Sequence, residues 1–308
     1  MHPETISTPI SNLLAGLGAS ITFAAAAILF REYALRVSTI WMNAFKATVA
    51  LTAFIVVSIF VSDWRAFITH PQAPTVVGAF LLSGLAGLNI GDFFLVQAFT
   101  RLGSSRTLMI FSFQPLLLAL GGAVLLSQAL TGHQLAAILC LIGCVLILSY
   151  ERYRIAGRWE IRGLCEAFAG VTLDGVGVLI SRWAFEQGTG VDVLQGSLFR
   201  CVGACLGFAG LGFFRRSTFR AKPFLKSFVN LSTRDRGIVL IASFMGTFMS
   251  LWLWTYAISS GHLASVVALG GTGPLFAALI ECLVARRLPS HYLWGALLFF
   301  GVGFALML

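Results

Sequence analysis

Four charged side chains lie inside stretches of the sequence that are otherwise apolar. Lys46 and Arg200 are cations, whereas Asp92 and Asp174 are acids. A charge inside an apolar span is costly, and such a residue usually faces the interior of a helix bundle or a wet cavity. Cations there suit a carboxylate or a phosphate, and acids suit an amine or a proton. The four residues therefore predict a site for binding a small organic molecule or for coupling its movement to protons.

Each of these charges also has a structural interpretation. The two cations lie about two turns inside their segments, so their long side chains could snorkel to the membrane surface. Asp92 could simply pair with Lys46. Asn43 and Asn89 each stand three positions before a charge, at 46 and 92, and therefore share a helix face with it. Both interpretations stay open, and the two amides join the candidate site residues.

Two prolines interrupt apolar segments at equivalent places. Pro115 follows Gln114, and Pro274 follows the tetrapeptide GGTG. Proline removes one helical hydrogen bond and kinks the helix, and in a membrane the freed carbonyl is tolerated beside protein or a cavity. We expect Pro115, Gly271, Gly273 and Pro274 to act as kink or gating elements, with Gln114 as a site candidate. Helix curvature without movement is the alternative.

Trp252 and Tyr256 stand four positions apart near the end of an apolar segment, so they share one helix face. Aromatic residues at the end of a span are usually anchors at the membrane surface. The other interpretation is that they line a substrate cavity, where an aromatic or quaternary-amine group would stack on them.

The composition shows which kind of fold must hold these residues in place. Of 308 residues, 58% are hydrophobic and 11% are charged, whereas a soluble domain has about 25% charged residues. A spanning helix needs about 20 mostly apolar residues, and the loops between such segments are too short for a further domain. The sequence predicts an all-α membrane protein with ten transmembrane helices, at 13–30, 39–61, 75–99, 105–125, 131–150, 162–185, 192–214, 236–258, 262–284 and 290–308.

The chain contains the same plan twice. Pro115 follows Ala98 by 17 positions, and Pro274 follows Ala257 by the same interval. The octapeptide NAFKATVA corresponds to SLFRCVGA, which pairs the two interior cations. Five spans in each half make the halves enter the membrane in opposite directions, and such folds bind substrate near the midplane. We therefore expect two inverted five-helix repeats, at 1–150 and 151–308.

The distribution of basic residues predicts the orientation. Seventeen Lys and Arg residues follow odd-numbered segments, and the opposite side carries Arg65 and Arg182. Cytoplasmic loops collect Lys and Arg, so we expect the odd-numbered loops to be cytoplasmic and both termini to lie outside, in a bacterial inner membrane. Because the basic residues flank spans on one side, the charge does not indicate nucleic-acid binding.

Motifs for other chemistry are absent from the sequence. It has no HExxH, CxxC or GxSxG, and its six cysteines lie mostly within apolar segments, where they suit packing. We therefore expect no enzyme activity, no metal and no cofactor. The expected partners are a small-molecule substrate and the lipid bilayer, and we expect a monomer, because an enclosed bundle needs no partner to cover its polar residues.

The paired cations and prolines resemble the EamA branch of the drug/metabolite transporter superfamily over nearly the whole chain. The matching motifs are LFRCVGA in segment 7 and the stretches SSRTLMIFSFQP (104–115) and ASVVALGGTGP (264–274). The family's Gly-Glu-Arg-Leu after spans 4 and 9 is replaced by SQAL (127–130) and ARRL (285–288). Members often have cytoplasmic termini, whereas the charge distribution here indicates the reverse.

The resemblance implies alternating-access transport of a small organic metabolite, often its efflux. The presence of both charge signs favours an amino-acid-like or amine-containing substrate. An exchanger of organic anions or nucleotide sugars is the alternative within transport. A membrane channel or a membrane enzyme is the alternative of another class.

Overall fold

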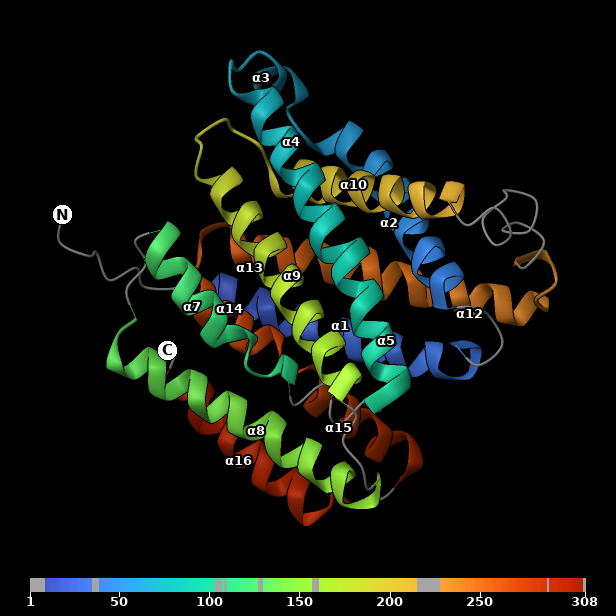
Figure 1. The fold of residues 1–308 in the computed structure, drawn as a ribbon, viewed down its shortest axis with the longest axis vertical. Coiled ribbons are helices and arrows are strands. Elements are labelled where there is room, and N and C mark those ends of the chain that lie inside the picture. Colours follow the sequence, from blue (N-terminus) through green and yellow to red (C-terminus); the bar gives the residue numbers. More distant parts are fainter. Residues whose placement is uncertain are drawn as a thin grey trace.

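The computed structural model describes residues 9–34, 39–102, 107, 110–126, 130–156, 161–214, 228–286 and 288–306. Within these ranges every regular element is a helix (Figure 1). The first half forms α1 (Ile10–Ala34), α2 (Thr39–Val61), α3 (Trp64–Ile68), α4 (Ala73–Ser83), the π-helix η1 (Gly84–Gly91), α5 (Asp92–Leu102), α7 (Gln114–Leu125) and α8 (Gly132–Ala156). The predicted all-helical class is confirmed for this part of the chain.

The second half is also helical within the described ranges. It forms α9 (Ile161–Phe185), α10 (Val193–Phe214), α12 (Thr233–Ser243), the π-helix η2 (Phe244–Met249), α13 (Ser250–Ser260), α14 (Leu263–Gly270), α15 (Gly273–Ala285) and α16 (His291–Ala305). Serine caps begin two of these helices: the Ser232 hydroxyl accepts from the Asp235 amide, and the Ser290 hydroxyl accepts from the Leu293 amide.

Seven of the predicted segments coincide with helices long and apolar enough to cross a membrane. The other three coincide with apolar helices of 10–17 residues, which lie within α7, α8 and α16. The outer surface is apolar as well: Phe60 is 83% exposed, Leu120 67% and Leu298 68%. Such a surface suits lipid rather than water, so the protein is a multi-pass integral membrane protein.

The third predicted segment of each half of the chain forms a long helix, and each of these two helices contains a π-helical stretch. One helix runs through α4, η1 and α5, and the other runs through α12, η2 and α13. In the first, Gly84 faces α10 so closely that an added Cβ would overlap the carbonyl of Arg200. On the same stretch, an added Cβ on Gly87 would lie 3.1 Å from Oδ1 of Asp174 on α9. The glycines therefore allow η1 to pack tightly between α9 and α10.

Proline stands in the first turn of two helices. Pro115 begins α7, and Pro274 begins α15 just after α14 ends at Gly270. Proline is tolerated there because the first helical N–H groups have no partner within the helix. At Pro274 the structure therefore has a break between two helices, whereas the sequence predicted a kink in one helix.

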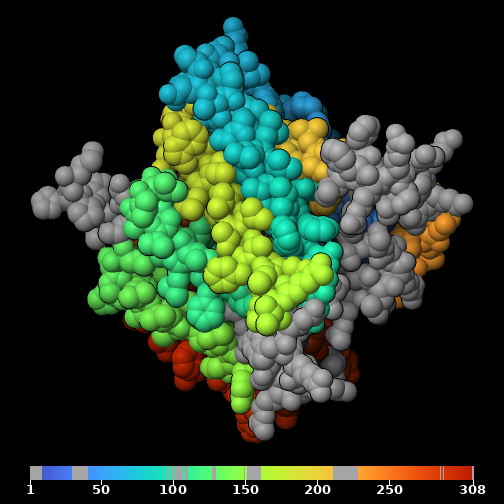
Figure 2. Space-filling view, viewed as in Figure 1, coloured from blue at the N-terminus to red at the C-terminus, as the bar shows by residue number. Residues whose placement is uncertain are grey.

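The packing of the helices brings the two halves together. In Figure 1, α8 and α16 lie side by side, and Figure 2 shows α9 on the visible face between α4–α5 and α7. The helices that pack most extensively belong to opposite halves: α1 against α13, α14 and α15; α9 against α4, η1 and α5; α10 against α2, α4 and η1. The interior is therefore built jointly by the two halves.

Candidate functional site

The structure brings the interior charges together from several helices. Asp174 comes from α9, Arg200 from α10, Lys46 from α2, and Asp92 from the junction of η1 and α5. Asp92 interacts electrostatically with each of the other three. Gln114 joins them from the first turn of α7. Five of the residues predicted from the sequence thus form one polar cluster, which we call the central cluster: Lys46, Asp92, Gln114, Asp174 and Arg200.

The closest contact in the central cluster is between Gln114 and Asp174. The side-chain amide Nε2 of Gln114 donates to Oδ2 of Asp174 at 2.6 Å. Oδ1 of the same carboxylate lies beside Gly87, where a larger residue would be in tight contact with it. Asp174 therefore connects the proline-containing start of α7 with α9.

Arg200 is the most deeply buried charge of the central cluster. Arg200 is 1% exposed, and its Nε and Nη1 have no hydrogen-bond partner among the described residues. Asp174 is the acid that attracts it most strongly, and Asp92 attracts it less strongly. A buried guanidinium with free donors is suited to bind a carboxylate or a phosphate, because each free N–H group can donate to an anionic oxygen.

Lys46 and Asp92 are less buried than Arg200. Both are half-buried, and Lys46 is attracted by Asp92. Lys46 belongs to α2, and Asp92 is the first residue of α5. This relationship agrees with the interpretation that the two residues pair, and it leaves both side chains at the accessible part of the central cluster.

The two candidate asparagines have different surroundings. Asn89 is buried, and its Nδ2 donates to the Ala204 carbonyl at 3.4 Å, where Gly207 leaves room for it. This contact fixes η1 to α10. Asn43 is half-buried on α2, one turn before Lys46.

Trp252 and Tyr256 lie apart from the central cluster. They are 40% and 41% exposed, similar to the apolar residues Leu240 and Phe244 earlier in the same long helix. This placement favours the interpretation as membrane-surface anchors. Trp254, by contrast, is half-buried, and its indole lies against Gly270 at the break between α14 and α15.

Ser20 is an interior residue that the sequence interpretation did not place among the candidate site residues. It is 2% exposed on α1, and its hydroxyl donates to the carbonyls of Leu269 and Gly270 at 3.1 and 2.8 Å. A serine in an apolar segment carries no charge that would single it out. One sequence feature could have found it: Ser20 precedes Asp174 by 154 positions, the interval that also separates Lys46 from Arg200.

Polar contacts also join the halves near the ends of two long helices. Asn12 near the start of α1 donates to the Tyr256 and Ala257 carbonyls at 3.0 and 2.9 Å and to the Ser260 hydroxyl at 3.0 Å. Near the start of α9, Oε2 of Glu166 lies 2.9 Å from Nε of Arg101 at the end of α5. In each case the first helix of one half is fastened to the third segment of the other half.

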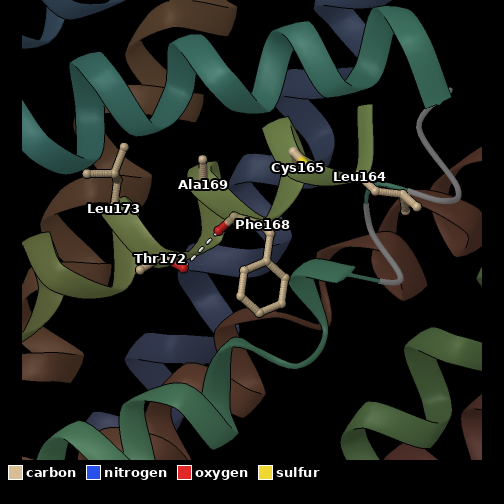
Figure 3. A pocket seen from close by; sticks show the side chains of 6 residues that line it. All are labelled: Leu164, Cys165, Phe168, Ala169, Thr172 and Leu173. Carbon is tan, nitrogen blue, oxygen red and sulfur yellow. Dashed lines mark hydrogen bonds between the residues drawn. The ribbon is translucent and has the colours of Figure 1, made fainter. Parts of the chain in front are cut away.

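A cavity of about 600 Å³ lies against the outer face of α9, away from the central cluster. Figure 3 shows its lining, with the Phe168 ring projecting from the helix and the Thr172 hydroxyl donating to the Phe168 carbonyl at 2.8 Å. Phe168 is 60% exposed. The cavity is an apolar surface groove that lacks the charges of the central cluster. Its lining residues are Leu164, Cys165, Phe168, Ala169, Thr172 and Leu173.

Metal ligands do not gather in the described part of the chain. No group of three or more His, Cys, Asp or Glu residues in these ranges is arranged to hold a metal ion. Cys144 and Cys201 are buried and unpaired, consistent with a packing role.

Comparison with known proteins finds similarity to a family over part of the chain and a similar fold over nearly all of it. Residues 10–150 match the model of the EamA-like transporter family. A solved structure titled only "Crystal structure of protein" has a TM-score of 0.76 at 17% identity, covering 97% of this chain and 96% of that chain. At this identity the similarity shows the fold alone. No curated protein matches the sequence.

Proposed function

Because residues 10–150 place this chain in the drug/metabolite transporter superfamily, we propose that it is a secondary transporter that moves a small organic metabolite by alternating access. The observation that carries the proposal is the central cluster. Two acids, two cations and an amide from five helices meet inside a bundle whose outer surface is apolar. Buried charges of both signs are costly in a membrane and usually mark a pathway for a substrate or an ion.

The proposed architecture is ten spans in two inverted five-helix repeats, 1–150 and 151–308. The helix packing supports this architecture. The first helix of the first half, α1, packs against α13 and α15, and the first helix of the second half, α9, packs against α5 and α7. The pairs α2 with α10 and α8 with α16 join equivalent helices. Both third segments contain a π-helical stretch, and a proline follows in each half. In this architecture α7, α8 and α16 complete the spans.

The proposed substrate is amino-acid-like or amine-containing, and the proposed direction is export. Asp92, half-buried at the accessible part of the central cluster, would bind the ammonium group or carry a coupled proton. Arg200 would bind a carboxylate. The free Nε and Nη1 of Arg200 also favour a second candidate, an exchanger of organic anions or nucleotide sugars. The two candidates differ in whether an amine is required.

The proposed orientation places the odd-numbered loops in the cytoplasm and both termini outside, in a bacterial inner membrane and as a monomer. One contact supports a common side for two of these loops. Arg101 after the third segment and Arg162 at the start of the sixth both approach Glu166, at 2.9 and 3.4 Å. The end of α5 and the start of α9 therefore lie at the same end of the bundle.

A metabolite panel would test the function directly. The purified protein would be heated with amino acids, amines, organic acids and nucleotide sugars, and any stabilising compound would then be assayed for counterflow in liposomes. We expect an amine-containing compound to stabilise the protein and to exchange, and Asp92→Asn to reduce both effects. Thr172→Val, on the exposed face of α9, is the matched control. A panel in which nothing stabilises or exchanges would contradict the proposal.

A further inference from the structure

The break between α14 and α15 leaves the Gly270 carbonyl without its usual donor. Pro274 has no N–H, so it cannot donate to the Gly270 carbonyl four residues earlier. Inside a membrane, where water is scarce, an unsatisfied carbonyl is costly. The hydroxyl of Ser20 on α1 donates to this carbonyl at 2.8 Å. Ser20 thus replaces the hydrogen bond that Pro274 removes.

Both hydroxyl groups at this break belong to buried residues. Ser20 is 2% exposed and Thr272 is 0% exposed. Gly270 is covered by the Trp254 indole so closely that an added Cβ would overlap the ring. The Thr272 hydroxyl donates to the Leu269 carbonyl at 2.6 Å, which satisfies the neighbouring position. The donor for Gly270 therefore comes from a different helix, α1, which belongs to the other half of the chain.

At Pro115, where Ser112 and Phe113 form a turn before α7, a residue of the other half also makes a contact, but with a side chain rather than with the freed carbonyl. Gln114, in the first turn of α7, donates to Asp174 on α9 at 2.6 Å. Asp174 follows Ser20 by 154 positions, and Pro274 follows Pro115 by 159. Nearly the same intervals relate a second pair of contacts, since Ser250 follows Gly91 by 159 positions and Asp174 follows Ala19 by 155. The Ser250 hydroxyl donates to the Ala19 carbonyl at 3.1 Å, and a Cβ on Gly91 would lie 3.2 Å from the Asp174 amide nitrogen.

From these contacts we infer that Ser20 and Asp174 are positioning residues, each of which holds the proline break in the other half of the chain. The role of these two contacts in a transport cycle rests on the proposed function. The two bonds differ in charge: Ser20 is neutral, whereas Asp174 also interacts with Arg200 in the central cluster. A substrate charge that binds in the cluster therefore acts on the break at Pro115 and leaves the break at Pro274 unchanged.

A double-mutant cycle tests the bond without any substrate. Ser20→Ala should lower the thermal midpoint of the purified protein by about 2–4 °C, the shift for one lost hydrogen bond in a large chain. In a Pro274→Ala background the shift should fall to less than about half, because the substituted alanine restores the N–H donor to Gly270. Equal shifts in both backgrounds would overturn the inference.

Two further variants separate this role from general packing. Ser20→Thr keeps the hydroxyl and should restore the midpoint. Thr22→Ala removes a hydroxyl that bonds within α1 itself, to the Gly18 and Ala19 carbonyls. Hydrogen exchange of the amides of residues 271–273 and 275 should rise about fivefold in Ser20→Ala and stay unchanged in Thr22→Ala. A rise in both variants would assign Ser20 a packing role only.

The second arm uses the compound that stabilises the protein most in the metabolite panel. This compound should change amide exchange at 114–120 and leave exchange at 271–275 unaltered, and Asp174→Leu should abolish the first effect. A response at both breaks would overturn the difference between Ser20 and Asp174. If no compound binds, the proposed function fails, whereas the cycle of Ser20 and Pro274 still decides the positioning role.

Discussion

Glu166 and Arg101 form an ion pair with 2.9 Å between Oε2 and Nε, near the start of α9 and at the end of α5. It corresponds to the contact of Asn12 with Ser260, because Glu166 follows Asn12 by 154 positions and Ser260 follows Arg101 by 159. The first helix of each half is thus fastened to the third segment of the other half, by charge in one case and by neutral hydrogen bonds in the other.

Because the contact of Glu166 with Arg101 is ionic, its contribution to stability should depend on the salt concentration. Arg101 and Glu166 have 29% and 12% of their side-chain area exposed, so Glu166→Gln should destabilise the protein by about 1 kcal/mol at low salt and less at high salt. The measurement is thermal unfolding in detergent at two salt concentrations. Arg162→Gln is the control, because Arg162 is 73% exposed and 3.4 Å from Glu166. An equal effect of the two variants would contradict the assignment.

The tight packing of η1 against α10 predicts a large effect of one methyl group. Gly84→Ala places a Cβ on the Arg200 carbonyl, and because a backbone atom cannot rotate away, the cost should be about 3 kcal/mol. Gly78→Ala on the preceding α4 meets nothing within 4 Å, so it should be neutral or slightly stabilising. Expression and thermal midpoint measure both. A well-folded Gly84→Ala protein would show that α10 can move away from η1.

The segments and the central cluster could be predicted from the sequence because their physical signals are local. Apolar runs of membrane-spanning length define the helices, and Lys46, Asp92, Asp174 and Arg200 are conspicuous because charges in such runs need partners. Ser20 gives no comparable signal, since its importance comes from a carbonyl freed by Pro274 in a distant helix. That relationship exists only once α1 packs against α14.

The face on which Trp252 and Tyr256 lie could not be predicted for a different reason. A π-helical stretch adds one residue to a turn, which shifts the phase of every later side chain by about 100°. η2 precedes both residues in the same long helix, so the α-helical spacing counted from Leu240 no longer tells which face they occupy. The shared face of the two residues was still predictable, because both follow η2.

Proton coupling, if it operates through Asp92, should be lost when the acid is replaced by an amide. In liposomes containing the most stabilising metabolite, Asp92→Asn should reduce accumulation driven by a pH gradient by about tenfold or more, the effect of losing one charged interaction. Asp92→Glu keeps the acid and serves as the control. Unchanged gradient-driven accumulation in Asp92→Asn would exclude this role for the residue.

The free donors of Arg200 predict a requirement for a carboxylate. Arg200→Gln should weaken binding of an amino acid by about 10–100-fold, whereas binding of its methyl ester, which lacks the negative charge, should change by less than about threefold. Titration calorimetry measures both ligands. Arg200→Lys keeps the charge that faces Asp174 and controls for an unpaired buried acid. Equal losses for the acid and the ester would place the carboxylate elsewhere.

The Asn12 contact predicts an order of stability among variants that residue size alone does not predict. Asn12 uses its NH₂ group as a donor to two carbonyls and a hydroxyl at the end of α13. Asn12→Ala loses these bonds, but Asn12→Asp also places a carboxylate against the carbonyls that Asn12 satisfied. Asn12→Asp should therefore be more destabilising, by about 1–3 kcal/mol beyond Asn12→Ala.

The exposed neighbour Ser11 gives the matched control, because Ser11→Asp adds the same charge near the positive start of α1 and should be neutral or mildly stabilising. Thermal midpoints for the three variants decide the matter: an Asn12→Asp protein as stable as Asn12→Ala would mean that the amide does not act as the donor at this position.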